Sequence, residues 1–494
     1  MTVPSGYNYF YGGISMKVPF SDYLTSIEPG LQALTDRLSK KYDYTSLLAA
    51  DSPGLNITVS RTRREVSSAT LASERGMVVR TAKNGQYSEY SFNRFDPDHV
   101  DEAFEKICAA LDEQQELLTM TGSDVYKTAV PEDKSQEISA MFDTEQLPEN
   151  ADVKDIVARF TKADEEALAS GHHLIECIIR AQSTHVSKLF LTKNKCLKQS
   201  YVYSEMTIIP VACRPEDGRN VMAYEGISDQ CGPELFADPE ALMKKALRRT
   251  DELLTARRVK PGEYEIITSP EVSGLIAHEA FGHGVEMDMF VKDRALGKEY
   301  IGKRVGSDLV TMHEGALCAK DVTSYAFDDE GTPAGDVTEI DHGILKTGIC
   351  DALSALRLNT KPTGNGKREN FEHKVYTRMT NTVFDSGTDT LEAMIASVKH
   401  GYLLEGMESG MEDPKHWGIQ CIVSEGHEIM DGKLTGRIVS PIIMTGYVPD
   451  LLGSISMASA DREVFGTGAC GKGHKEWVKV SDGGPYLKMK VTLG

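Results

Sequence analysis

Two histidines bracket a glutamate at residues 278 to 283, where the chain reads His-Glu-Ala-Phe-Gly-His. Imidazole nitrogens are common zinc ligands, and a carboxylate next to a zinc-activated water can serve as a general base. His278 and His283 are therefore candidate metal ligands, and Glu279 is the candidate catalytic base. The chemistry that this pattern predicts is hydrolysis at a zinc ion.

The spacing of the two histidines restricts the backbone that can carry them. The segment is similar to the helical His-Glu-x-x-His motif, but it has one additional residue between the histidines. In a regular α-helix, residues five apart point about 140° away from each other, so His278 and His283 could not share one metal. A π-bulge brings such side chains back to nearly one face. Because Gly282 and Gly284 weaken a regular helix, we predict a distorted or ending helix at 280–284.

A catalytic zinc site also needs a third protein ligand, with a fourth position left for water. Glu286 and Asp288 follow the motif closely and are candidates. A distant cysteine or histidine is the other possibility, and we favour Cys470, which lies in the glycine-rich segment 466–474. The neighbouring Lys472 would favour its thiolate form. The alternative for Cys470 is a small buried residue in a glycine-rich turn.

The dipeptide His-Glu occurs twice more, at His313-Glu314 and His427-Glu428, without a second histidine nearby. A lone histidine is more often packed or solvated than metal-bound, so we predict no catalytic metal at either place. The alternative for residues 278–283 themselves is a capped core helix.

Composition narrows the classes of function. The 494-residue chain has a formal net charge of −20, which disfavours nucleic-acid binding without a local basic patch. We see no apolar stretch long enough to span a membrane and no secretory signal. The nine cysteines include no Cys-x-x-Cys pair, which fits free thiols in a reducing cytosol. We therefore expect a cytoplasmic protein with no nucleic-acid or membrane partner.

Periodicity and capping signals predict an α+β protein of two domains. Residues 1–240 are expected to form a mixed α/β domain with helices on an antiparallel sheet. Residues 241–494 are expected to form a mainly β domain with the motif helix at its start. The predicted helices cover 20–44, a segment from Asp96-Pro97 onward, 151–170 and 238–258; the predicted strands lie in 54–93, 173–181, 186–192, 201–212 and 264–268; residues 121–150 are expected to be a loop.

Several segments together resemble the TldD/PmbA proteases, also called modulators of DNA gyrase. The resemblance is carried by His278-Glu-Ala-Phe-Gly-His-Gly-Val-Glu-Met-Asp288, Asp329-Glu-Gly-Thr-Pro333, Pro362-Thr-Gly-Asn-Gly-Lys-Arg-Glu369, Arg378-Met-Thr-Asn-Thr382 and Cys470-Gly-Lys472. It covers most of the chain and is strongest from Ser269 to the end. Because the chain has both the histidine motif and the late cysteine, it resembles the zinc-bearing TldD-like branch rather than the PmbA-like (TldE) branch.

The resemblance implies Zn²⁺ held by His278, His283 and Cys470, with Glu279 in catalysis. It also implies a homodimer, or a heterodimer with a PmbA/TldE-like subunit, that admits peptides or unfolded proteins as an added β-strand. The chain departs from the family pattern at Met287, at His474 and in the longer, more charged segment 405–417, which we expect near the peptide path.

The expected function is that of a zinc metallopeptidase, and the alternative is a non-catalytic subunit that binds peptides or a partner. Arg378, Asn381 and His474 are candidate substrate contacts that could stabilise an oxyanion. The family segments 329–333, 362–369 and 378–382 are expected to line the active cleft. The content of zinc in the purified chain discriminates between the enzyme and the subunit.

Overall fold

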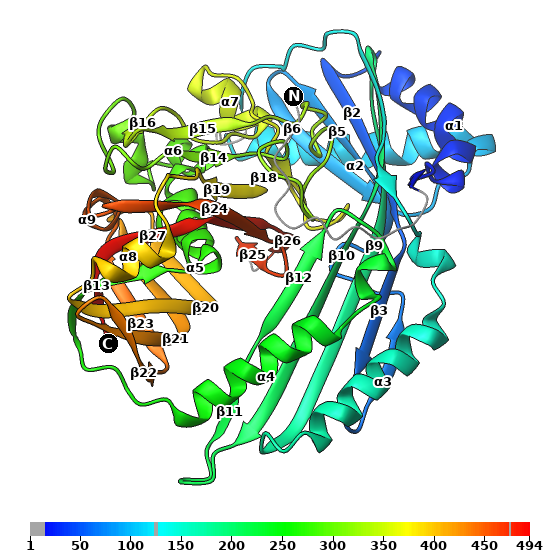
Figure 1. The fold of residues 1–494 in the computed structure, drawn as a ribbon. Helices are drawn as coiled ribbons and strands as arrows, with labels where there is room; N and C mark the ends of the chain where they lie inside the picture. The colour runs from blue at the N-terminus through cyan, green and yellow to red at the C-terminus, as the bar shows by residue number, and fades with distance from the viewer. Residues whose placement is uncertain (1–14, 123–126, 474–475) are drawn as a thin grey trace.

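The computed structural model describes residues 15–122, 127–473 and 476–494. Its N-terminal half is built on a mainly antiparallel sheet (Figure 1). Among the described residues this sheet contains β2 (Tyr44–Ser52), β3 (Gly54–Val59), β4 (Arg64–Ser67), β5 (Glu74–Lys83), β6 (Gln86–Phe92), β7 (Gln136–Met141), β9 (Leu174–Thr192), β10 (Lys195–Cys213), β11 (Asn220–Met222) and β12 (Glu225–Asp229). The long strands β9 and β10 pair along nearly their whole length and are the central strands of this half.

Two pairs of helices cover different parts of this sheet, as Figure 1 shows. The first pair, α1 (Asp22–Leu38) and α2 (Val100–Met120), packs on β2, β5 and one end of β9. The second pair, α3 (Val153–Ala169) and α4 (Glu240–Thr255), packs on β3, β10 and the other end of β9. Each helix presents an apolar stripe to the sheet, which is the usual reason for such packing.

The C-terminal half is organised around a second, mixed sheet. Among the described residues it contains β13 (Gly262–Thr268), β14 (Met312–Glu314), β15 (Val337–Asp341), β16 (Ile344–Leu345), β19 (Asn381–Phe384), β20 (His400–Asp413), β21 (Gly418–Met430), β22 (Lys433–Val439), β23 (Ile442–Tyr447), β24 (Met457–Phe465) and β27 (Ser481–Leu493). The helices here are short: α5 (Pro270–Leu275), α6 (Met287–Val291), α7 (Ala352–Leu358), α8 (Leu391–Ala396) and α9 (Val448–Gly453). Small two-stranded pairs complete this half: β17 (Gly366–Lys367) with β18 (Tyr376–Thr377), and β25 (Ala469–Lys472) with β26 (Glu476–Lys479). A further pair, β1 (Met16–Lys17) with β8 (Asp143–Thr144), comes from the N-terminal half of the chain.

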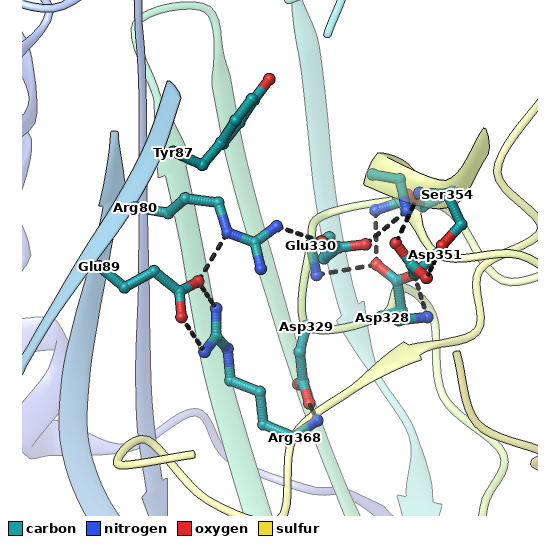
Figure 2. A network of polar contacts seen from close by, with 12 residues as sticks. Arg80, Tyr87, Glu89, Asp328, Asp329, Glu330, Asp351, Ser354 and Arg368 are labelled. Carbon is teal, nitrogen blue, oxygen red and sulfur yellow. Dashed lines mark hydrogen bonds and ion pairs between the residues drawn. The ribbon is translucent and has the colours of Figure 1, made fainter. Parts of the chain in front are cut away.

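A buried network of charged side chains joins the two halves (Figure 2). Arg80 of β5 pairs with Glu89 of β6 at 2.6 Å and with Glu330 of the C-terminal half. Arg368 reaches the same Glu89 at 2.5 Å, and its backbone N–H donates to Asp329. Because both guanidinium groups have carboxylate partners, their burial is compensated. The network fixes the segments around residues 330 and 368 against the N-terminal sheet.

The predicted α+β class is confirmed, with a C-terminal domain that is mainly β. The expected loop at 121–150 is wrong in part, because β7 lies within it and pairs in parallel with β10. The helix α4, which we assigned to the C-terminal domain, buries Leu242, Met243 and Ala246 in the core shared with α3. Its packing therefore associates it with the N-terminal half. No helix in the described ranges is long and apolar enough to cross a membrane.

Candidate metal centre

The motif lies on a helix that changes its winding just before the first histidine. Ser269 caps the start of α5, since its side chain accepts a hydrogen bond from the N–H of Val272, and Pro270 occupies the first helical position. Regular α-helix ends at Leu275, and a π-helical segment runs from Ile276 to Gly282. A short 3₁₀ turn, His283–Val285, follows. The predicted distortion is confirmed, and it begins a turn earlier than 280–284.

The wide turn brings the two imidazoles together. The N–H of His283 donates to the carbonyl of His278, which is the five-residue hydrogen bond of a π-turn. The two ring centroids lie 5.0 Å apart with their planes nearly perpendicular. Both side chains therefore project to one side of the helix, as the sequence required of them if they share a metal.

Cys470 approaches this pair from the hairpin of β25 and β26. Its Sγ lies 3.4 Å from Nε2 of His283. One donor atom each from His278, His283 and Cys470 can be chosen so that all three lie within 4.8 Å of one another. The structure thus brings together three residues that the sequence separates by almost two hundred positions. They remain candidate ligands, now with a common location.

The donor set and spacing suit a zinc ion. Tetrahedral geometry with ordinary zinc–nitrogen and zinc–sulfur bonds separates N and S ligand atoms by roughly 3.5 Å, close to the distance found here. Burial alone would raise the pKa of the Cys470 thiol, but His283 and His278 hold it well below its usual value. Since a thiolate is the form that binds metal, the site favours the ligand form of Cys470.

Glu286 supports His283 from the side that faces away from Cys470. Its carboxylate lies 3.1 Å from Nδ1 of His283 and 3.0 Å from the ammonium of Lys472. Burial opposes ionisation of Glu286, but Lys472 and His283 lower its pKa to about 2. A charged carboxylate on Nδ1 fixes the ring so that Nε2 points at the cysteine. Glu286, considered above as a third ligand, therefore supports the candidate ligand His283.

Asp288, the other nearby alternative, is also turned away from the triad. It pairs with Lys472 at 2.8 Å and with Lys292 at 2.9 Å. Lys472 thus links Asp288 to Glu286 and, through it, to His283. The sequence suggested that Lys472 would stabilise the thiolate, whereas the structure pairs it with these two carboxylates.

Glu279 lies beside the triad, with Oε2 3.9 Å from Nε2 of His283. Strand β20 passes directly over it: a Cβ added at Gly410 would lie only 2.4 Å from Cγ of Glu279. Trp417, at the end of the same charged segment, is fully buried and packs on Phe281 of the motif helix. The segment 405–417 is therefore a strand and turn that confine the helix carrying the candidate base.

The three candidate substrate contacts have different locations. Arg378 is 1% exposed, and its guanidinium donates to the carbonyl of Cys470 at 2.5 Å, so it holds the ligand hairpin. Asn381 is fully buried, and its side chain bonds to Thr323 and to the carbonyl of Gly315. We therefore no longer assign either side chain to substrate, because both are committed to internal contacts. His474 lies outside the described residues.

Two of the family segments also lie against the N-terminal half. Residues of 329–333 and 362–369 contact the N-terminal sheet through the network of Figure 2. They line a cavity of about 340 Å³ whose lining includes none of the three candidate ligands; from these segments it includes Asp329, Glu330, Thr332, Pro362 and Arg368. Segment 378–382 contacts the β25–β26 hairpin through Arg378, and segment 362–369 contacts it through Lys367, whose ammonium donates to the carbonyl of Lys479 at 2.7 Å.

Sequence reasoning missed the residues that position the candidate site residues. Gly410 gave no signal, because a glycine in a strand has many possible causes. Arg378 was singled out for its charge, and only the fold shows that the charge faces a carbonyl. The fold and these side chains together define an α+β protein with a His₂Cys candidate metal site beside a carboxylate.

Comparisons with known proteins give the same class. Residues 261–493 match the PmbA/TldA metallopeptidase C-terminal domain. A metalloprotease of Methanocaldococcus jannaschii is 32% identical over 252 residues, which are 51% of this chain and 55% of that protein. A zinc metalloprotease TldD homolog of Saccharolobus solfataricus is 29% identical over 292 residues, 58% of this chain and 63% of that protein. The chain thus spans little more than half the length of these two relatives.

The crystal structure of TldE from Thermococcus kodakarensis has a similar fold, with a TM-score of 0.73 and 16% identity over 94% of this chain and 100% of that one. At this identity the likeness concerns the fold alone. Residues 261–493, just under half of the chain, carry the C-terminal domain of the PmbA/TldD family.

Proposed function

We propose that this protein is a zinc-dependent metallopeptidase of the TldD type that hydrolyses peptides or unfolded proteins. The observation that carries the proposal is the convergence of four side chains on one point. His283 Nε2 is 3.4 Å from the sulfur of Cys470 and 3.9 Å from the carboxylate of Glu279, and His278 completes the set. The names of the relatives as metalloproteases support the same activity.

The chain's own residues supply binding, orientation and proton transfer. Zinc held by His278, His283 and Cys470 would polarise the substrate carbonyl and lower the pKa of a water in the remaining position. Glu279 accepts a proton from the attacking water as its oxygen bonds to the carbonyl carbon. The carbon–nitrogen bond then breaks, and Glu279 returns the proton to the leaving amine. Glu286 keeps the ring of His283 oriented throughout.

Strand β20 offers a path for an extended peptide. On one side, β20 pairs with β13 only at residues 401–404 among the described residues. The remainder of β20 pairs with β21 on its other side and runs over Glu279. A peptide added to this edge would be held by main-chain hydrogen bonds, which tolerate varied sequences. This arrangement supports unfolded chains as the substrate class.

The test is to replace Glu279 with glutamine in the full chain. We expect Glu279→Gln to retain zinc, measured by elemental analysis, while cleavage of a denatured, fluorescently labelled protein falls by about 10²–10⁴-fold. Glu428→Gln, from the His427-Glu428 pair, is the matched control and should keep full activity. Full activity of Glu279→Gln would remove this residue from the mechanism. A wild-type chain without zinc would favour the non-catalytic subunit instead.

We further propose that the enzyme works as a dimer, either with a second copy or with a PmbA/TldE-like subunit. The family resemblance supports this assembly, and the TldE fold fits it. Light scattering of the purified chain, alone and mixed with a TldE-like protein, distinguishes the two dimers from a monomer. A monomer under both conditions would contradict the proposal.

A further inference from the structure

A second group of metal-binding side chains lies where α4 meets the hairpin of β20 and β21. Glu252, Glu425 and His427 each offer one ligand atom, and these atoms lie within 4.8 Å of one another. Glu425 and His427 are two residues apart on β21, so both project from the same face of the sheet. Glu252 comes from α4, whose apolar residues pack in the N-terminal core. The group therefore spans the two halves of the molecule.

Glu405 joins this group from the neighbouring strand. It stands directly opposite Glu425 in the register of β20 and β21. Two carboxylates in this position repel each other unless a cation lies between them. Oε2 of Glu405 is 2.9 Å from Nε2 of His427, although the two atoms lack the alignment of a hydrogen bond. Nε2 is also 4.0 Å from Oε1 of Glu425.

These separations are close to those between ligands of one metal ion. With metal–ligand bonds of about 2.0–2.2 Å, neighbouring N and O donors lie roughly 3.0–3.5 Å apart. The observed values of 2.9 and 4.0 Å fall around this range. Glu425 is fully buried, yet its Oε2 has no hydrogen-bond partner among the described residues, and the same holds for the buried Oε2 of Glu252. A buried carboxylate oxygen without a partner indicates a missing cation or proton.

The permanent cations nearby do not balance the acidic groups. Arg249 is 2% exposed and pairs with Glu225, Glu271 and Glu425 at 2.8, 3.2 and 2.9 Å. Lys245 adds a second contact to Glu225 and Arg248 a distant one to Glu252. Five carboxylates thus face three cations, and two negative charges remain when His427 is neutral. One divalent cation would compensate both.

We propose that Glu252, Glu405, Glu425 and His427 bind one first-row divalent cation, which fastens α4 to the β20–β21 hairpin. The donors are oxygen and imidazole nitrogen without sulfur, so Zn²⁺ and Mn²⁺ both suit the site. The candidate catalytic centre differs because its thiolate favours zinc. The rival explanation is that protons balance the group, since burial raises the pKa of Glu425 to about 7.

The test separates the two sites by mutation. A full-length His283→Ala/Cys470→Ser chain, stripped with a chelator, is titrated with ZnCl₂ and with MnCl₂ by calorimetry at pH 7.5. We expect one equivalent of at least one metal to bind, and its Kd to rise at least tenfold when His427→Asn is added to this background. The same metal should raise the thermal midpoint of the double variant and leave that of the triple variant unchanged.

His400→Asn is the matched control for loss of a histidine. His400 lies on β20 and contacts Glu428, whose side chain is on the opposite face of the hairpin from His427. Metal affinity should be unchanged in this variant. Glu405→Gln serves as a second variant if circular dichroism shows that the His427→Asn chain is misfolded. Absence of binding to the double variant, or binding that survives His427→Asn and Glu405→Gln, would overturn the proposal. Either outcome is independent of peptidase activity.

Discussion

The same dipeptide, His-Glu, stands in a helix at residue 278 and in strand β14 at residue 313, and its two side chains behave differently. On β14, consecutive side chains point to opposite faces. His313 faces Asp336 at 2.7 Å near the surface, whereas Glu314 is fully buried and accepts hydrogen bonds from Thr380 and Thr382. In the π-helix, the imidazoles of His278 and His283 lie beside the carboxylate of Glu279.

The difference shows that the backbone decides what a short motif can do. A strand separates adjacent side chains, so a His-Glu pair there serves two unrelated structures. A widened helical turn gathers residues at positions 1, 2 and 6 of the motif. The proposed chemistry then needs one further donor, and the sulfur of Cys470, on a distant hairpin, lies close enough to supply it. Each substitution below removes one feature of the helix site. The loss of metal binding or activity should show how much that feature distinguishes the helix site from the His-Glu pair on β14.

The largest change should follow loss of the sulfur donor. We expect Cys470→Ser to lose one equivalent of zinc relative to the wild type and at least about 10³-fold in peptidase activity, because two imidazoles alone bind zinc weakly. Elemental analysis and the cleavage assay measure both. Cys213→Ser, a half-buried cysteine outside the site, is the control. An unchanged number of zinc equivalents in Cys470→Ser would contradict the assignment of the third ligand.

The next largest effect should come from the strand above the base. A Cβ at Gly410 would overlap Cγ of Glu279, so Gly410→Val must displace that side chain. A displacement of about 1 Å can reduce catalysis by roughly 10²-fold, and we expect that loss in kcat with zinc content unchanged. Gly418→Ala in the same hairpin is the control, because nothing lies within 4 Å of its added Cβ. Equal activity of the two variants would show that Glu279 needs no such confinement.

Much of the site could be predicted from local sequence, and the rest depended on the fold. The six-residue motif with two nearby glycines was enough to predict a distorted helix, although Gly282 also matters for packing, since Met379 leaves no room for a Cβ. The residues alone left Cys470 open as a ligand, because no periodicity links positions so far apart. Arg378 and Asn381 are polar residues of the family segment 378–382, but local sequence does not reveal which polar groups face inward.

The fold likewise has features that local sequence predicts and others that depend on tertiary contacts. Capping signals such as Asp96-Pro97 and helical periodicity indicated the helices, and the α+β class followed from the order of helices and strands. Strand β7 was missed because it is short, lies in a polar and acidic stretch of sequence, and is stabilised by parallel pairing with β10. The association of α4 with the N-terminal core likewise arises from tertiary contacts.

A smaller effect should follow loss of the carboxylate that orients His283. We expect Glu286→Gln to weaken zinc binding by about 10–100-fold, while activity at saturating zinc stays close to normal. The measurement is competition with a chromophoric chelator. Asp288→Asn is the matched control. Asp288 also pairs with Lys472, whereas the contact with Nδ1 of His283 is made by Glu286. An equal loss in both variants would assign the effect to Lys472.

The smallest effect concerns the strand histidine and is one of stability. Hydrogen bonding to Asp385 raises the pKa of His313 to about 9. Partial burial opposes this shift, and Asp336 adds to it. A histidine in the unfolded chain has a pKa of about 6.5. The folded state therefore binds the proton more tightly, and the resulting stability is complete below about pH 6.5 and disappears as the pH rises through about 9. Urea unfolding should find His313→Asn less stable than the wild type at pH 6, with the difference shrinking towards pH 9.5.

Asp385→Asn should move this window to lower pH, because it removes the main cause of the raised pKa. A wild-type–variant difference that does not vary with pH would show that His313 contributes packing rather than charge. The contrast with the proposed metal-binding role of His278 and His283 would then lose its electrostatic basis.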